Sequence, residues 1–262
     1  MIAGDETDVY LPQSKAIINY TFPVALFLQG FDVDKSCYSQ FARQLASYGF
    51  LVLVPNHRPA GRPFFAPELE QISKILTSFT VESKNSHSLN ESLDIQRIAL
   101  LGHSAGGLTG LQALQNILPV QENKKDNLLP KLVGGVFYGS QLTGVQMKKK
   151  KEVPIALISG SLDGIVSPKL TKETYQNLQS IPKAFITIKG TNHYGITNTA
   201  QPPDGPKEEH LPLLEQHIST HKIAHLSAIF LRAYMLNDKA SCEYFSCNDC
   251  QLDEATSLLI SK

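Results

Sequence analysis

The hydrophobic residues of this chain fall into short, nearly uninterrupted runs, and longer segments with a helical period lie between them. The six runs cover residues 24–28, 51–54, 98–101, 132–138, 155–158 and 185–188. Strands that are buried on both faces have this composition, because neither face needs polar residues. The helix-like segments lie at about 38–48, 67–83, 105–118 and 168–180. This alternation predicts an α/β fold, with a mostly parallel central sheet flanked by helices.

Further segments complete the predicted fold at the two ends of the chain. A long helix is expected at about 213–236, with an apolar face formed by Ile218, Leu226, Ile229, Phe230 and Ala233. Residues 8–20 are expected to supply one or two leading strands, for which an antiparallel arrangement stays open. No internal repeat or linker interrupts the pattern, so residues 1–262 are predicted to form a single domain, ending in a cysteine-containing tail at about 238–262.

Composition and charge narrow the possible functions only slightly. Hydrophobic residues make up 42% of the chain, and 24 basic residues balance 24 acidic ones. Without net charge, nothing at this level favours a nucleic-acid partner or an acidic membrane. No apolar run approaches the roughly 18 residues of a membrane span, and the N-terminus does not resemble a signal peptide. We therefore expect a cytoplasmic protein, with an exported or processed form as the alternative.

The four cysteines leave three interpretations open. Cys37 stands alone, whereas Cys242, Cys247 and Cys250 cluster near the C-terminus. They are reduced thiols in a surface tail, or two of them form a disulfide, which requires an oxidising compartment. A zinc site is the third interpretation, but a fourth ligand and a second short pair are not evident.

Residues 102–106, Gly-His-Ser-Ala-Gly, match the pattern G-x-S-x-G. They lie between a strand-like run and a helix-like segment. A serine on such a sharp turn is held in a strained conformation above the carboxyl end of the sheet, with the N-terminus of the helix beneath it. Glycines at 102 and 106 allow the neighbouring elements to approach closely. The context predicts that Ser104 is a catalytic nucleophile.

A serine nucleophile needs a base, and the base needs an acid that orients it. Asp163 follows the run 155–158, and His193 follows the run 185–188. The carboxyl ends of parallel strands share one edge of a sheet, so we expect both side chains to meet Ser104 there. The chain order Ser, Asp, His agrees with a catalytic triad. The alternatives are an ordinary turn aspartate and an ordinary loop histidine.

Acyl transfer also needs donors for the tetrahedral oxyanion. The backbone N–H of Ala105 is one candidate, and the N–H of Phe31, in the loop after the first central strand, is the other. The alternative for that loop is a plain strand-end turn. Phe31 and Tyr194 are the candidate substrate-binding residues. This chemistry is complete with protein groups, so no cofactor and no metal are predicted.

The other histidines are given lesser roles. His103 is expected to pack and to form hydrogen bonds rather than to act as a second base, and His57 is a candidate border of the cleft without a role. Three more recur at four-residue spacing on the last helix: His217, His221 and His225. Each step of four residues rotates by about 40° around a helix. Since an acidic or thiol partner is also missing, a solvated stripe is expected rather than a metal site.

Two loops bear on access to the predicted site. The proline-rich stretch 201–206 follows His193 closely and is expected to wall the site. About 14 residues separate Tyr138 from Val153, too few for a lid domain, and the lysines at 148–151 are expected in a solvated turn. We therefore expect a largely open cleft.

The chain resembles α/β-hydrolases of the chlorophyllase, dienelactone hydrolase and cutinase-like polyesterase group. The resemblance is carried by Gln29–Gly30–Phe31, residues 102–107, Asp163 and residues 192–194. Residues 38–52 are particularly similar to chlorophyllases and bacterial polyester hydrolases. The resemblance extends from about residue 9 to about residue 234. It implies an α/β-hydrolase fold, with Ser104, His193 and Asp163 as nucleophile, base and acid. It also implies the N–H groups of Phe31 and Ala105 as the oxyanion hole.

Two positions differ from the pattern of the group. Many relatives carry His where this chain has Gln29, and chlorophyllases typically carry Arg where it has Ala105. The expected function is a serine carboxylic-ester hydrolase that acts through an acyl-enzyme on small or polymeric esters. The alternatives are acyl transfer to another acceptor, lactone or peptide hydrolysis, and a non-catalytic binding protein with a hydrolase fold.

Overall fold

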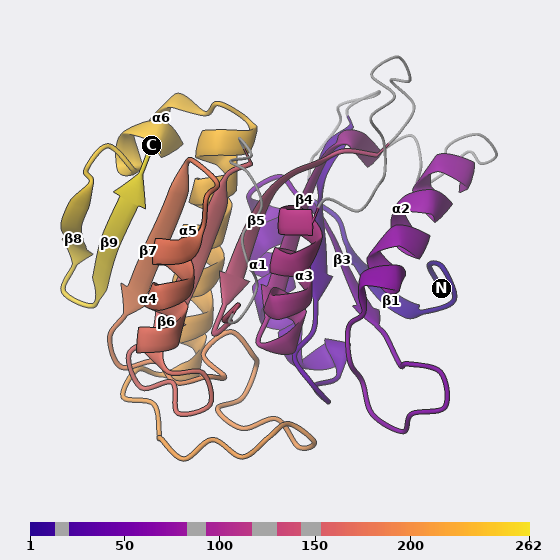
Figure 1. The fold of residues 1–262 in the computed structure, drawn as a ribbon, viewed down its shortest axis with the longest axis horizontal. Coiled ribbons are helices and arrows are strands. Elements are labelled where there is room, and N and C mark those ends of the chain that lie inside the picture. The colour runs from indigo at the N-terminus through magenta and orange to yellow at the C-terminus, as the bar shows by residue number, and fades with distance from the viewer. Residues whose placement is uncertain (14–20, 83–92, 117–129, 143–152) are drawn as a thin grey trace.

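The computed structural model describes residues 1–13, 21–82, 93–116, 130–142 and 153–262 (Figure 1). Its strands form one mixed sheet in the order β1-β3-β2-β4-β5-β6-β7-β9-β8. The six central strands run parallel to one another. They are β2 (Phe22–Leu28), β3 (Leu51–Asn56), β4 (Leu93–His103), β5 (Leu132–Tyr138), β6 (Ile155–Gly160) and β7 (Lys183–Ile188). The six apolar runs thus form the centre of the sheet, and the predicted α/β fold is confirmed.

Helices cover both faces of this sheet, as Figure 1 shows. On one face lie α2 (Leu69–Glu82), α3 (Ala105–Asn116) and α4 (Pro168–Asn177), and on the other lie α1 (Ser39–Ser47) and α5 (Gln216–Met235). Successive residues of β2 alternate between the two cores: Ala25 and Phe27 pack on the side of α1 and α5, and Val24 and Leu26 pack on the opposite side. Both faces being buried explains why the strand sequences carry no polar alternation.

Antiparallel strands form the two edges of the sheet. β1 (Glu6–Tyr10) pairs antiparallel with β3, so a leading strand is present, but it begins two residues before the predicted region 8–20. Residues 14–20 of that region lie outside the described part of the chain. The segment that we expected as a tail forms α6 (Lys239–Tyr244), β8 (Asp249–Asp253) and β9 (Thr256–Ser261). β9 pairs with β7, and β8 pairs with β9. These strands alternate between buried and more exposed residues, so they lack the apolar signature of the central ones.

The cysteines in this segment take one of the arrangements left open by the sequence. Cys247 and Cys250 form a disulfide just before and within β8. Cys242 is a free, exposed thiol, and Cys37 is free and partly buried.

Helix α5 differs from its prediction at the N-terminal end. It begins at Gln216, and Leu213, which we placed in its first turn, is 80% exposed. Leu226, Phe230 and Ala233 are buried as expected, whereas Ile218 is 37% exposed. The first turn of α5 projects beyond the core, so an apolar side chain there is left at the surface. In the described part of the chain, no helix combines the length and the hydrophobicity needed to cross a bilayer.

The carboxyl ends of the parallel strands meet at one edge of the sheet, at the bottom of Figure 1. Residues 189–215, which join β7 to α5, form turns and bends along this edge but no helix or strand. The turns after β2, β4 and β6 reach the same edge, so it collects the residues for which chemistry was predicted.

Candidate active site

Ser104 is the single residue between β4 and α3, and its backbone adopts a φ of +53°. This left-handed region is costly for a residue with a side chain and recurs at functional turns. The turn is held because the Ser104 N–H donates to the carbonyl of Tyr138 at 3.0 Å. A Cβ atom on Gly106 would lie 2.2 Å from the carbonyl oxygen of Leu28, so glycine is required there. Ser104 is thereby held in the turn at the carboxyl end of β4.

Asp163 and His193 form a buried hydrogen-bonded pair at the same edge. Nδ1 of His193 lies 2.9 Å from both carboxylate oxygens of Asp163, and the two residues are 4% and 2% exposed. The turn after β6 orients Asp163, because the N–H groups of Ile165 and Val166 donate to its Oδ1 at 3.1 and 2.7 Å. The imidazole is therefore fixed through Nδ1, and Nε2 remains the nitrogen that can exchange a proton.

The structure does not join Ser104 to this pair by a hydrogen bond. Among the described residues, Oγ of Ser104 has no hydrogen-bond partner, whereas its backbone is tied to β5. Oγ of Ser140 donates to the carbonyl of Ser104 at 3.1 Å. A Cβ atom on Gly139 would lie 2.9 Å from Oδ2 of Asp163 and 3.0 Å from Nδ1 of His193. The end of β5 thus contacts the serine turn on one side and the Asp163–His193 pair on the other.

His103 links three loops of this edge, as a packing and hydrogen-bonding residue was expected to do. The N–H of Gly30 donates to the hydroxyl of Tyr38 at 2.8 Å, and this hydroxyl lies 3.0 Å from Nδ1 of His103. Nε2 of His103 lies 3.0 Å from the carbonyl of His193. Because a carbonyl only accepts, Nε2 carries the proton and Nδ1 accepts from Tyr38. The chain of donors runs from the loop after β2 to the loop that carries His193.

Burial keeps His103 neutral. The residue is fully buried, and desolvation, followed by the charge of nearby His193, holds the pKa of His103 well below its usual range. Burial likewise raises the pKa of the Tyr38 hydroxyl well above its usual range. Both groups therefore keep the protonation states that their hydrogen bonds require.

Glu208 was not singled out from the sequence, yet it touches this site directly. Its side chain is 2% exposed. Oε2 accepts the N–H of His193 at 3.0 Å and the N–H of Gly164 at 3.1 Å, and Oε1 accepts the N–H of His210 at 2.9 Å. The sequence Lys-Glu-Glu at 207–209 reads as a solvated run, so no local signal announces the burial.

Phe31 lies in the turn after β2, at the same edge of the sheet. It is 40% exposed, and its ring centroid is 5.0 Å from that of Phe64, in the loop after β3. That loop is tied to the Phe31 turn, because the N–H of Asp32 donates to the carbonyl of Phe65 at 2.8 Å and the N–H of Phe65 donates back to Oδ1 of Asp32 at 3.1 Å. Across the described ranges, the N–H groups of Phe31 and Ala105 donate to no protein acceptor. Phe64 was not predicted from the sequence to lie beside Phe31.

Tyr194 differs from its predicted role. It is 1% exposed, its hydroxyl donates to the carbonyl of Pro206, and its ring packs edge-on against His193 with centroids 5.3 Å apart. A phenol so enclosed is a packing partner of the imidazole rather than a surface for a substrate. Burial, followed by the charge of Glu208, raises the pKa of Tyr194. Pro206 belongs to the proline-rich loop, which therefore contacts Tyr194 next to His193.

His57 serves as an anchor. Its Nδ1 lies 3.0 Å from Oδ2 of Asp5, and its Nε2 lies 3.2 Å from Oε2 of Glu68. These contacts hold the N-terminal residues against the loop after β3. The lysines at 148–151, and most of the crossover that contains them, lie outside the described residues.

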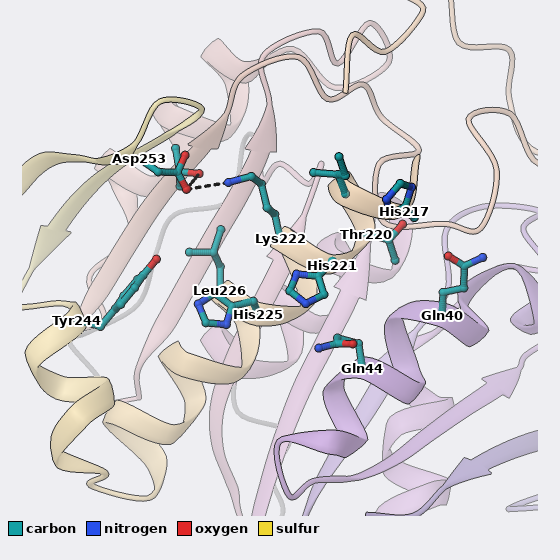
Figure 2. Close-up of a pocket in the computed structure, with 12 residues that line it drawn as sticks. Gln40, Gln44, His217, Thr220, His221, Lys222, His225, Leu226, Tyr244 and Asp253 are labelled. Atoms are coloured by element: carbon teal, nitrogen blue, oxygen red, sulfur yellow. Dashed lines mark hydrogen bonds and ion pairs between the residues drawn. The ribbon is translucent and has the colours of Figure 1, made fainter. Parts of the chain in front are cut away.

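A separate cavity of about 570 Å³ lies between α1 and α5 (Figure 2). The three histidines of α5 line it together with Gln40 and Gln44. The rings of His221 and His225 stack nearly parallel, with centroids 6.5 Å apart. Nδ1 of His225 lies 2.8 Å from the hydroxyl of Tyr48, a residue of the neighbouring α1 end. Where the structure is described, no three His, Cys, Asp or Glu side chains group closely enough to hold a metal ion.

Comparisons with known proteins include a match to the part of the chain that contains Ser104. A family model described as Chlorophyllase matches residues 10–121. Chlorophyllase-2 of Arabidopsis thaliana is 27% identical over 88 residues, which are 34% of this chain and 28% of that protein. Chlorophyllase-1, chloroplastic, of Citrus unshiu is 29% identical over 90 residues, which are 34% of this chain and 27% of that protein. The matches confirm the predicted resemblance to the chlorophyllase-like group of α/β-hydrolases.

The matches cover only part of this chain and of the relatives. This chain matches only about a quarter of the length of the curated relatives. The family match includes Phe31, Ser104 and Ala105 but ends before Asp163 and His193. The name of the Citrus protein places that protein in the chloroplast, a compartment other than the one predicted for this chain, whose location stays a prediction.

Proposed function

We propose that this chain, a chlorophyllase-like α/β-hydrolase, is a serine hydrolase of carboxylic esters. One observation carries the proposal: a buried Asp163–His193 pair lies at the same sheet edge as Ser104, whose backbone is held in the left-handed region. The names of the curated relatives support ester hydrolysis as the reaction class. The pair and the serine come from three separate loops, and a serine, an imidazole and a carboxylate are the three groups that this chemistry needs.

The first half of the reaction forms an acyl-enzyme. Oγ of Ser104 attacks the ester carbonyl while Nε2 of His193 takes its proton, and Asp163 stabilises the imidazolium through Nδ1. This step requires Oγ to come within about 3.2 Å of Nε2 when substrate is bound, a contact that often tightens only in the complex. The N–H groups of Phe31 and Ala105 are the proposed donors to the oxyanion. His193 then protonates the departing alcohol.

The second half releases the acid. A water molecule attacks the acyl carbonyl, Nε2 of His193 takes its proton, and collapse of the tetrahedral intermediate returns that proton to Ser104. Every proton that moves is carried by a protein group or by water, so the proposed reaction needs no cofactor. The exposed Phe31 and the adjacent Phe64 are the proposed contacts for an apolar part of the ester.

Turnover of p-nitrophenyl butyrate tests the proposal. Ser104→Ala is expected to lower kcat by roughly 10⁴- to 10⁶-fold, and the matched variant Ser257→Ala, an exposed serine of β9, is expected to leave it unchanged. A fluorophosphonate probe should label Ser104, as located by mass spectrometry of the digested protein. Retained turnover in Ser104→Ala, or a folded wild-type protein without label, would refute the proposal.

The acceptor distinguishes hydrolysis from transfer. If water is the natural acceptor, adding methanol or a primary amine during turnover should divert only a minor part of the acyl group. Formation of mainly methyl ester or amide at low acceptor concentration would favour an acyltransferase instead. A series of esters, lactones and peptides under the same conditions separates the remaining alternatives.

A further inference from the structure

Glu208 is a buried carboxylate that the proposed chemistry does not use. We propose that it is a positioning residue, which holds His193 and the turn carrying Asp163 in one fixed relation; this inference rests on the proposed function. A buried charge is costly unless it is well hydrogen-bonded. Glu208 satisfies this condition with three backbone N–H groups, from Gly164, His193 and His210. Hydrogen bonds to an ionised acceptor are roughly twice as strong as neutral ones.

The two N–H groups that share Oε2 belong to different loops. Gly164 follows Asp163 in the turn after β6, and His193 lies in the turn after β7, 30 positions after Asp163 in the sequence. A single oxygen atom therefore bridges the backbones of the acid and the base. Any change in the distance between these loops changes the contact between Nδ1 and the carboxylate, and with it the direction of the imidazole.

Glu208 is itself held in place by its own loop. Its N–H donates to Oε1 of Gln201 at 2.9 Å, and Nε2 of Gln201 donates to the carbonyls of Gly205 and Pro206 at 3.2 Å. Nδ2 of Asn192 donates to the carbonyl of His210 at 2.9 Å, which fixes the far side. Residues 201–210 thus form an internally hydrogen-bonded loop, and the Glu208 carboxylate is the group of this loop that contacts the turns of both Asp163 and His193.

The absence of a side chain at position 164 makes room for this contact. A Cβ atom on Gly164 would lie 2.4 Å from Oε1 of Glu208 and 2.8 Å from Nδ1 of His210. Both atoms are the ends of flexible side chains, so Gly164→Ala would move them without forcing the backbone apart. The Gly164→Ala variant therefore displaces the carboxylate of Glu208 without changing Glu208 itself or its charge.

Three variants and one control distinguish the effect of the hydrogen bonds that Glu208 accepts from the effect of its negative charge. Glu208→Ala removes the acceptor, and kcat for p-nitrophenyl butyrate is expected to fall roughly 10- to 100-fold at little change in KM, because a small misplacement of a catalytic group has effects of this size. Glu208→Gln retains one carbonyl oxygen for the two N–H groups and is expected to stay near the wild-type kcat. Gly164→Ala is expected to fall between them. Glu209→Gln, the exposed neighbour, makes the same change of charge and should have no effect.

A spectroscopic measurement tests the positioning without any turnover. The proton that Nδ1 of His193 shares with Asp163 is expected to give a downfield proton NMR signal, assigned by its loss in His193→Gln. The signal should persist in Glu208→Gln and should shift or broaden in Glu208→Ala at a temperature well below its Tm. It also separates two failures, because a wild-type protein without esterase activity refutes the proposed function and leaves this test intact.

Two results would overturn the inference. One is a Glu208→Ala protein that keeps both the wild-type kcat and an unchanged signal. The other is a Glu208→Gln protein as impaired as Glu208→Ala, which would assign the effect to the charge instead of the bridge. If Glu208→Ala does not fold, Gly164→Ala decides the question through the same two measurements, and a wild-type kcat and signal in that variant overturn the inference.

Discussion

Imidazoles gather in two regions of this molecule, the carboxyl edge of the sheet and the cavity along α5. At the sheet edge, His103, at the end of β4, and His193, in the turn after β7, are 90 residues apart and almost completely buried. Along α5, His217, His221 and His225 come from one helix and line an open cavity (Figure 2). A regular spacing in the sequence is thus less informative about chemistry than the ends of separate strands, because residues of one helix turn away from one another while strand ends converge.

The groups that contact the imidazole rings also differ between the two regions. His193 has a carboxylate on Nδ1, and His103 has a donor on one nitrogen and an acceptor on the other. In the cavity, the pKa of His225 is lowered by burial, then by the charges of His221 and Lys222. Positive neighbours disfavour a protonated ring, whereas an aspartate stabilises one. The sheet edge is therefore suited to hold an imidazolium during a reaction, and the cavity is not.

The largest expected effect comes from the carboxylate that makes this difference. Asp163→Asn should lower kcat for p-nitrophenyl butyrate roughly 10⁴-fold, because an amide no longer stabilises the imidazolium or fixes the tautomer. Oδ1 of the amide can still accept the N–H groups of Ile165 and Val166, so Tm should change little. Asp249→Asn, at an exposed position of β8, is the control. A kcat within tenfold of the wild type would contradict the assigned role of Asp163.

The meeting of Asp163 and His193 at this edge could be predicted from the sequence because it depends on local patterns. Each central strand is an apolar run, and Asp163 and His193 directly follow two such runs, so their meeting follows from strand order alone. The strained turn at Ser104 follows from glycines within two residues of it. Where a residue's environment is set by its neighbours in the chain, the pattern was sufficient.

The contacts made by distant loops could not be predicted in this way. Glu208 looks solvated in its local sequence, and only the folding of residues 189–215 over the edge buries it. Tyr194 was predicted to contact a substrate, but the same loop covers it through Pro206. The C-terminal strands β8 and β9 were not predicted from the sequence. They lie at an edge of the sheet, where one face stays partly exposed, so their sequences contain no long uninterrupted apolar run.

A second prediction compares the two regions by their effect on stability. The pKa of His103 is held well below 6.5 in the folded protein, whereas an unfolded histidine titrates near 6.5. Below that pH the unfolded chain binds a proton that the folded protein does not. The free energy of unfolding should therefore fall as the pH decreases from 6.5, by up to about 1.4 kcal/mol per pH unit for this one group.

Urea unfolding at pH 7.5, 6.5 and 5.5 measures this slope. His103→Gln should show a weaker dependence on pH, together with a lower stability at pH 7.5 from the lost contacts. His217→Gln is the matched change in the cavity, and since that imidazole is 71% exposed it should leave the slope as in the wild type. An unchanged slope in His103→Gln would show that this histidine is not the group that resists protonation.

The smallest effect is expected from the cavity itself. In the double variant His221→Gln/His225→Gln, kcat/KM for the ester should equal that of the wild type. The free energy of unfolding should fall by about 1 kcal/mol, the value of the contact between His225 and Tyr48. The result is informative because α5 does reach the site at its first turn. Nε2 of Gln216 donates to the carbonyls of Tyr194 and Thr197 at 2.8 and 2.7 Å.

That first turn provides the contrasting variant. Gln216→Ala removes both contacts to the loop that carries His193, so it should lower kcat/KM, while the double variant two turns further along should not. Equal and unimpaired activity in both would show that α5 supports the fold alone. A tenfold loss in the double variant would show that the histidine cavity is coupled to the sheet edge through the helix, and the division between the two regions would then be wrong.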